Sequence, residues 1–191
     1  MEFTPELRRE YRRLFRTAKV RPERKPLVQQ VATSLAAHRH RYERAGGPIG
    51  VPWWFVAIIH SLEASQNFHT HLHNGDPLSG RTVHVPAGRP PGDPPFTWVE
   101  SARDALTFDG LADVGGWSIS RALFRFEGFN GFGYRKSTID IPSPYLWSFS
   151  QHYTRGKFAS DGVYDPNLVS QQCGAAVLLR TMVDEGIVAT T

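Results

Sequence analysis

The chain has 191 residues, of which 40% are hydrophobic and 12% aromatic, which is enough for one sizeable core but not for two full domains. Its single cysteine excludes an internal disulfide, and its longest apolar run, residues 51–59, is about half as long as a membrane-spanning helix must be. Because no apolar stretch follows the N-terminal arginines, the sequence predicts no signal peptide and a protein that folds in the cytoplasm.

The net charge of +4 is unevenly distributed along the chain. Residues 1–44 contain twelve of the 22 lysines and arginines but only five of the 18 acidic residues, so this segment carries about +7 and the remainder about −3. A basic face of this kind suits a polyanion, such as a nucleic acid, an anionic lipid or the anionic polymers of a cell wall. A solvated helical face without a partner would have the same composition.

Apolar residues recur at helical spacing in two segments near the N-terminus. Residues 5–17 and 27–44 are predicted to form amphipathic helices, with Pro22 and Pro26 interrupting the pattern between them. A Gly-Gly-Pro sequence at residues 46–48 is expected to end the second helix.

A buried helix and a short β region are predicted next. Residues 53–63 are apolar on nearly all sides, which is typical of a helix inside the core, and Glu63 ends this helix. From residue 67 to residue 95 the composition changes to Gly, Pro, His, Asn and Asp, and the alternation at residues 81–85 predicts a β-hairpin followed by a Pro-rich loop. Helical patterns return at residues 98–106, 118–127, 144–153 and 167–185.

These elements predict one domain, residues 1–191, with an α+β fold that is mostly helical. Residues 1–47 would be its basic N-terminal helical segment, and residues 48–191 its catalytic core. We expect a cleft between the hairpin lobe and the C-terminal helices.

Glu63 is the most informative position for chemistry. A carboxyl group at the end of an apolar helix is either paired, or partly desolvated with a raised pKa, and the second state suits a general acid. Glycoside hydrolysis needs such an acid together with a second carboxylate. Asp76, in the sequence Asn-Gly-Asp-Pro, is a candidate for the second group, although by itself this sequence is simply a good turn.

The order Glu63, Asp76, Thr82 resembles the catalytic arrangement of phage-type lysozymes, in which an acid at a helix end precedes an Asp and a Thr on a β-hairpin. The spacing of Asp76 and Thr82 matches that motif, whereas the gap from Glu63 to Asp76 is longer by several residues. The segment 57–65 is also similar to the Glu-Ser helix end of goose-type lysozymes and lytic transglycosylases.

A second resemblance lies downstream. Residues 126–134 resemble the Tyr-Asn-Gly glycan-binding motif of the same superfamily, and they are followed by aromatic segments at residues 143–147 and 153–158. Aromatic faces can stack on sugar rings, and an Asn side chain can bind an N-acetyl group. Taken singly, however, each of Phe132, Tyr145 and Trp147 is expected to belong to the core. The resemblance implies that the following residues bind substrate: His73, Asn130, Gly131, Tyr134, Tyr145 and Trp147.

The resemblance implies a lysozyme-like muramidase that cleaves the β-1,4 bond between N-acetylmuramic acid and N-acetylglucosamine in the glycan strands of peptidoglycan. Glu63 would be the acid, Asp76 the base, and Thr82 would hold the water. The enzyme would be a monomer without a cofactor, would bind anionic wall polymers rather than nucleic acid through its basic segment, and would act on the cell wall, as an endolysin does. Two alternatives stay open: a lytic transglycosylase that uses Glu63 alone, and a non-catalytic module that binds the wall or another polyanion.

The histidines around Asp76 support a further alternative. In an extended segment His69, His71 and His73 would share one face, and with a carboxylate nearby they could bind zinc. No standard zinc-protease signature is present, so we expect no metal and histidines that line the cleft or hydrogen-bond around Asp76. The helical setting of Cys173 predicts a packed small residue and not a nucleophile.

Overall fold

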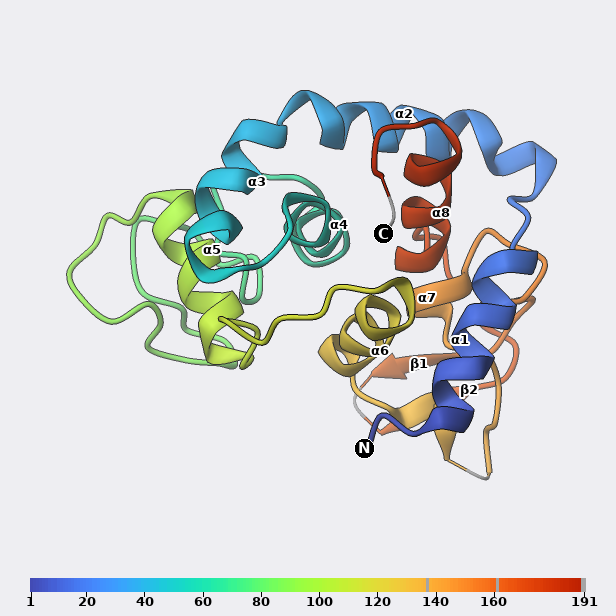
Figure 1. Ribbon diagram of the computed structural model, residues 1–191. Helices are drawn as coiled ribbons and strands as arrows, with labels where there is room; N and C mark the ends of the chain where they lie inside the picture. Colours follow the sequence, from blue (N-terminus) through green and yellow to red (C-terminus); the bar gives the residue numbers. More distant parts are fainter. Residues whose placement is uncertain (137, 161, 190–191) are drawn as a thin grey trace. The chain divides into compact units, whose positions relative to one another are not determined.

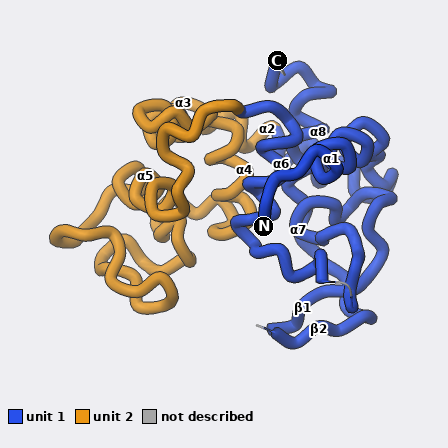
Figure 2. The backbone as a smooth tube through the Cα atoms, turned by 60° about the horizontal axis from the view of Figure 1, so that its bottom comes forward, with its two compact units in different colours: residues 1–32, 117–191 blue, residues 33–116 orange. Residues whose placement is uncertain are grey.

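The computed structural model describes residues 1–136, 138–160 and 162–189 (Figure 1). Helices hold 49% of the described residues and two short antiparallel strands form a small sheet, so the fold is a mixed, α+β one. The chain forms two compact units: unit 1 comprises residues 1–32 and 117–191, and unit 2 comprises residues 33–116 (Figure 2). The basic segment 1–47 therefore contributes to both units.

Unit 1 is built on α1, whose sequence explains its position. The Thr4 hydroxyl accepts a hydrogen bond from the Leu7 backbone N–H and caps the helix, and Leu7, Tyr11 and Leu14 bury one face. Helix α1 packs against α6, and α7 packs against both α6 and α8. The elements of unit 1 are α1 (Pro5–Thr17), η1 (Pro22–Arg24), α6 (Ile119–Asn130), η3 (Gly133–Arg135), α7 (Pro144–Trp147), β1 (Lys157–Ser160), β2 (Val163–Asp165) and α8 (Ala175–Asp184).

Unit 2 is organised around α4, which is buried along most of its length because its sequence is almost entirely apolar. Helix α3 packs against both α4 and α5. A capping box between Thr97 and Glu100 fixes the start of α5. The elements of unit 2 are α3 (Arg39–Gly46), η2 (Gly47–Ile49), α4 (Trp53–Ala64) and α5 (Trp98–Phe108), and α2 (Lys25–Ala37) crosses the boundary between the units.

Most of the predicted helices are confirmed, with corrected limits. Helix α1 has its predicted bounds, and α4, α5 and α6 lie within three residues of theirs. The predicted helix 27–44 is two helices that meet at His38. Only the first turn of the predicted helix 144–153 forms, as α7, and the last helix begins at Ala175 and not at residue 167.

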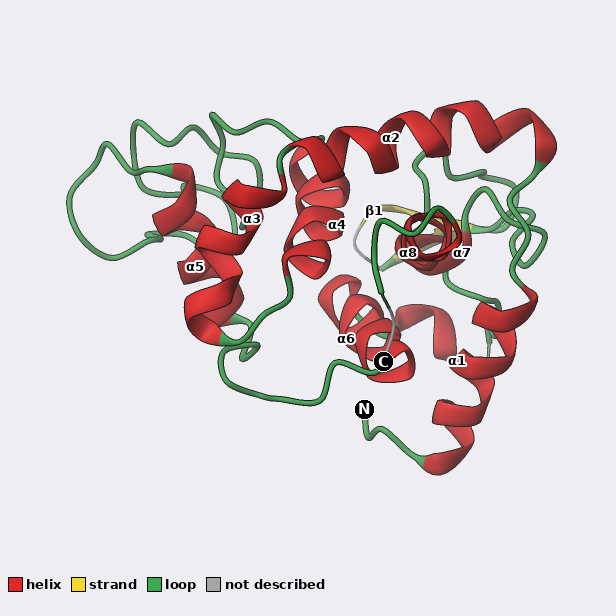
Figure 3. Cartoon of the chain, turned by 45° about the horizontal axis from the view of Figure 1, so that its top comes forward, coloured by secondary structure: helices red, strands yellow, loops and turns green. Residues whose placement is uncertain are grey.

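The predicted β-hairpin within residues 67–95 is wrong. This segment consists of loops and turns with one isolated bridge, between Thr70 and Pro77 (Figure 3). The backbone N–H groups of Val83 and His84 donate to a side-chain carboxylate and not to a neighbouring strand. The two-stranded sheet lies instead at residues 157–165, where Phe158 pairs with Tyr164.

Across the described part of the chain, no single helix is both long and apolar enough to cross a membrane. The segments Arg39–Ile49 and Trp53–Ala64 are long and apolar enough for a membrane span only when they are taken together, and the chain bends by 113° between them.

Candidate active site

Glu63 lies half-buried in the last turn of α4. The helix ends immediately afterwards, because Ser65 and Gln66 adopt left-handed backbone angles, with φ of 48° and 62°. The turn that carries Asp76 packs against this helix end: a Cβ atom on Gly75 would lie 3.9 Å from the Glu63 carbonyl oxygen. The structure therefore brings the backbone of the two predicted catalytic acids close together within unit 2.

Asp76 is a buried carboxylate that the surrounding loop encloses, with 7% of the residue exposed. Its Oδ2 accepts hydrogen bonds from the backbone N–H groups of Val83, at 2.8 Å, and His84, at 3.0 Å. Its Oδ1 lies 2.6 Å from Nδ1 of the His84 ring, which is largely exposed. These hydrogen bonds, that of the His84 side chain first, lower the pKa of Asp76 to about 2. Asp76 is therefore ionised at neutral pH and suits a charge partner or a weak base, not an acid.

Thr82 holds the same loop closed. Its hydroxyl donates to the Pro86 carbonyl and accepts a hydrogen bond of 2.9 Å from the Arg89 backbone N–H. The backbone of Thr82 also pairs with Arg89, at 2.7 Å. Thr82 thus precedes the residue whose N–H binds Asp76. Its hydroxyl proton is donated to the Pro86 carbonyl oxygen and not to a ligand.

The rings of His71 and His73 are hydrogen-bonded to protein groups, whereas His69 is exposed. His71 is fully buried, with Nδ1 2.8 Å from the Ser101 hydroxyl and Nε2 2.8 Å from the Gly80 carbonyl oxygen. His73, predicted to contact sugar, has a side chain that is 1% exposed and lies 2.8 Å from the Asp104 carboxylate, and its burial lowers its pKa. The described residues contain no group of three or more His, Cys, Asp or Glu side chains that could hold a metal ion.

The predicted glycan-binding residues, apart from His73, lie in unit 1, and only some are accessible. Asn130 is exposed at the end of α6, where Gly131 stops the helix with a φ of +81°, an angle that favours glycine. Tyr145 is half-buried in α7. These three residues can reach a ligand in solution.

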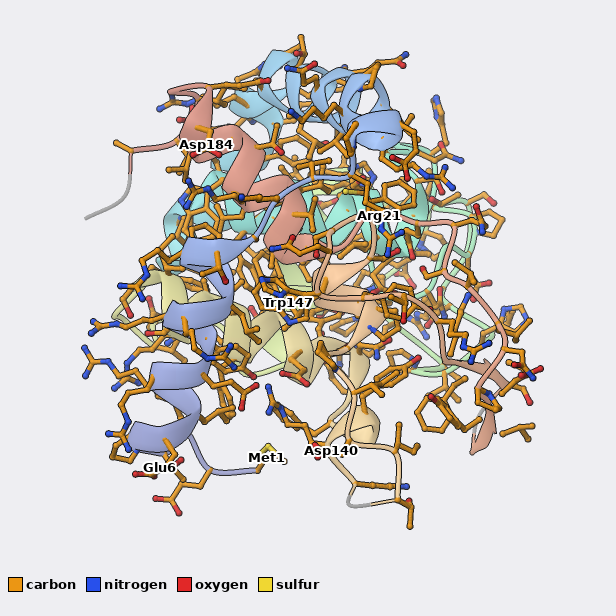
Figure 4. All side chains as sticks on the ribbon, turned by 90° about the vertical axis from the view of Figure 1, so that its right-hand side faces the viewer. Met1, Glu6, Arg21, Asp140, Trp147 and Asp184 are labelled. Carbon is orange, nitrogen blue, oxygen red and sulfur yellow. The ribbon has the colours of Figure 1, made fainter. Side chains whose placement is uncertain are left out.

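Tyr134 and Trp147 are core residues. Trp147 is 1% exposed, and the labelled side chain lies within the body of the molecule (Figure 4). Tyr134 is 4% exposed, and its hydroxyl accepts a hydrogen bond of 3.1 Å from the Phe158 backbone N–H of β1. Their side chains therefore support unit 1 from the inside.

Sequence reasoning missed a buried ionic cluster around Glu127 in unit 1. Glu127 is 1% exposed and accepts hydrogen bonds from the Tyr11 hydroxyl, at 2.5 Å, and from the Arg135 guanidinium, at 2.8 Å. Arg135 also binds Glu10 on α1, at 3.1 Å. Burial first, and then the charge of Glu127, raises the pKa of Tyr11. Within its own segment Glu127 looked like one polar position of an amphipathic helix, because its partner Tyr11 is 116 residues away.

No protein-family model, curated protein or solved structure matches this chain.

Proposed function

We propose that this chain is a peptidoglycan hydrolase of the muramidase type, with a lysozyme-like arrangement in which Glu63 is the general acid. The observation that carries the proposal is that two acidic residues in unlike settings, Glu63 and Asp76, lie on adjoining backbone segments of unit 2. Glu63 lies half-buried at the end of an apolar helix, and the adjoining turn holds Asp76 ionised with a pKa of about 2. Two carboxyl groups in environments of different polarity are what acid–base cleavage of a glycoside requires.

In the proposed reaction Glu63 gives its proton to the glycosidic oxygen between N-acetylmuramic acid and N-acetylglucosamine as the C–O bond breaks. A water molecule forms the new bond to the anomeric carbon and loses a proton to Asp76, and the proton then returns to Glu63 through solvent. Asp76 also stabilises the positive charge that develops on the sugar ring. Asn130, Gly131 and Tyr145 are the accessible residues of the predicted glycan set, and no cofactor takes part.

A lytic transglycosylase is a second candidate, and the hydrogen bonding of Asp76 favours it. Both oxygens of this carboxylate already accept hydrogen bonds, and a carboxylate with a pKa of about 2 is a weak base toward water. Glu63 would then act alone. After Glu63 has given its proton to the glycosidic oxygen, the 6-hydroxyl group of the muramic acid would attack the anomeric carbon in place of water, return its proton to Glu63 and give an anhydro sugar.

The proposal is tested with purified peptidoglycan and the variant Glu63→Gln, which keeps the shape of the side chain but has no proton to donate. Lysis measured as loss of turbidity should fall below about a tenth of the wild-type rate. Glu43→Gln is the matched control, because Glu43 is exposed on α3 in the same unit, and it should keep the wild-type rate.

The mass of the released fragments separates the candidates. Hydrolysis adds one water molecule per cleaved bond, whereas the transglycosylase releases an anhydro product that is lighter by one water. Substantial lysis by a well-folded Glu63→Gln variant would contradict both assignments. Binding of peptidoglycan without any cleavage by the wild-type protein would establish a non-catalytic wall-binding module.

A further inference from the structure

A second charged region lies in unit 1, where α1 packs against α6. Two neighbouring pockets lie along this helix pair, with volumes of about 350 and 330 Å³. Arg12 lines both pockets. The first is lined in addition by Arg8, Arg9 and Arg121, and the second by Arg16 and Arg180.

Most of these arginines are not neutralised by an acid. Two of the six, Arg9 and Arg180, form ion pairs with acids on their own helices. Within the residues that the structure describes, no acidic side chain pairs with any of the other four. Positive charges that gather around a pocket without counter-charges raise its potential and attract anions. The two pockets therefore favour a negatively charged ligand.

Ser120 adds an independent observation. It lies on α6, lines the second pocket and is 1% exposed, and its hydroxyl has no hydrogen-bond partner in the described part of the chain. Burying a hydroxyl without a partner costs free energy. Rotation of the Ser120 side chain toward the pocket would let an oxygen of a bound ligand supply the missing partner.

Phosphate is the anion that this donor set fits best. Guanidinium groups form paired hydrogen bonds with phosphate oxygens, and several such groups around one volume can bind the oxygens of a tetrahedral anion from different sides. Each pocket is near the lower end of the range for ligand sites, about 300–1,000 Å³. A phosphate with a small polyol fits one pocket, and two such pockets that share Arg12 suit consecutive phosphates of a polymer.

The aromatic residues of the pockets indicate which class of phosphate polymer the pockets can bind. The guanidinium of Arg121 lies over the Phe3 ring at 5.3 Å, and that of Arg180 lies over the Phe15 ring at 5.7 Å. Phe3 also packs against the ring of Phe124, at 5.1 Å. These rings are thus engaged within unit 1, and they offer no stacking platform of the kind that single-stranded nucleic acids use.

We propose that the groove between α1 and α6 binds the phosphates of a polyol-phosphate polymer, with Arg12 and Arg121 as the central ligands. The proposal rests on the proposed function only in placing such a polymer at the cell wall. There, binding of the polymer would hold the enzyme near its substrate. The chemistry of binding is independent of cleavage.

The test measures the affinity of a glycerol-phosphate oligomer by calorimetry, in the Glu63→Gln background so that no cleavage is involved. The pocket variant is Arg12→Gln with Arg121→Gln. The matched control is Arg13→Gln with Arg155→Gln, which removes the same charge from exposed residues of unit 1 that line neither pocket. The pocket variant should bind at least about tenfold more weakly than its parent, and the control should stay within about twofold.

Ser120→Ala provides a second readout that changes no charge and does not depend on the folding of the arginine variant. It should weaken binding about threefold. Equal weakening by the pocket and control pairs would overturn the proposal in favour of general charge attraction. A DNA oligonucleotide of equal phosphate number that binds as tightly, and loses the same affinity in the pocket variant, would show a nucleic-acid groove. Absence of measurable oligomer binding would also overturn it, whatever the outcome of the lysis assay.

Discussion

Each unit contains a buried carboxylate that accepts several hydrogen bonds, and the two are built in different ways. Asp76 in unit 2 receives its donors from Val83 and His84, seven and eight residues further along the chain. Glu127 in unit 1 receives one of its donors from Tyr11, 116 residues away, and that donor reaches it only when α1 packs against α6. Asp76 is therefore the centre of a self-contained loop, whereas Glu127 ties distant elements together. We expect changes at Asp76 to act mainly on the site and changes at Glu127 mainly on stability.

Glu127→Ala should give the largest effect on stability. It leaves the Tyr11 hydroxyl and the Arg135 guanidinium without their buried acceptor. Removing one partner of a buried ion pair costs about 3–5 kcal/mol, and the partial exposure of Arg135, 19% of its side chain, places the expected loss in the free energy of unfolding near the lower end. Urea unfolding measures this loss.

Glu6→Ala is the control for Glu127, because Glu6 forms an exposed ion pair with Arg9 on the surface of α1. Its urea midpoint should match that of the parent, because an exposed ion pair contributes little to stability. Unfolding of both variants at the same urea concentration as the parent would show that the cluster around Glu127 does not stabilise unit 1. It would contradict the claim that Glu127 acts mainly on stability and Asp76 mainly on the site.

Asp76→Asn should give a smaller loss of stability that depends on pH. Because the folded protein lowers the pKa of Asp76 from 3.8 to about 2, the carboxylate contributes stability that is fully present above pH 4. This contribution is lost as the pH falls toward 2, since the folded-state carboxylate is then protonated too. Melting temperatures of the parent and Asp76→Asn should differ at pH 7 and converge between about pH 4 and pH 2. A difference that stays constant over this range would show that the charge of Asp76 does not stabilise the loop.

The contrast also explains what the sequence could predict. Helix α4, whose end lies one residue beyond the predicted Glu63, was predictable because a long apolar segment is stable only inside the core. The turn around Asp76 is confirmed, with Gly75 at a φ of +82° and the Asn74 side chain accepting the Asp76 backbone N–H. These features depend on neighbours within a few residues.

The wrong predictions share a different cause. The alternation at residues 81–85 indicated a strand, but the N–H groups of Val83 and His84 bind a carboxylate, and a hydropathy pattern carries no information on that choice. Likewise, the segment around Glu127 does not reveal that Arg135 and Tyr11 converge on it. The burial of Tyr134 depends on packing between distant elements and could not be predicted from that residue, whereas Trp147 lies in the core, as expected for such an aromatic residue taken singly.

Removal of metal ions should have the smallest effect, because the loop around Asp76 is held by hydrogen bonds of its own residues. Zinc bound by His69, His71 and His73 would need a ring nitrogen from each. In the structure both ring nitrogens of His71 are bonded, to Ser101 and Gly80, and each such bond contributes about 1 kcal/mol that a metal would have to replace. Dialysis against a chelator should therefore leave both the melting temperature and the lysis rate unchanged. His71→Ala should lower the melting temperature equally with and without chelator, since it removes the same hydrogen bonds in either case. A chelator-induced loss of stability in the parent that zinc restores, and that is absent in His71→Ala, would instead make these histidines metal ligands and the hydrogen-bonded loop the metal-free form of the site.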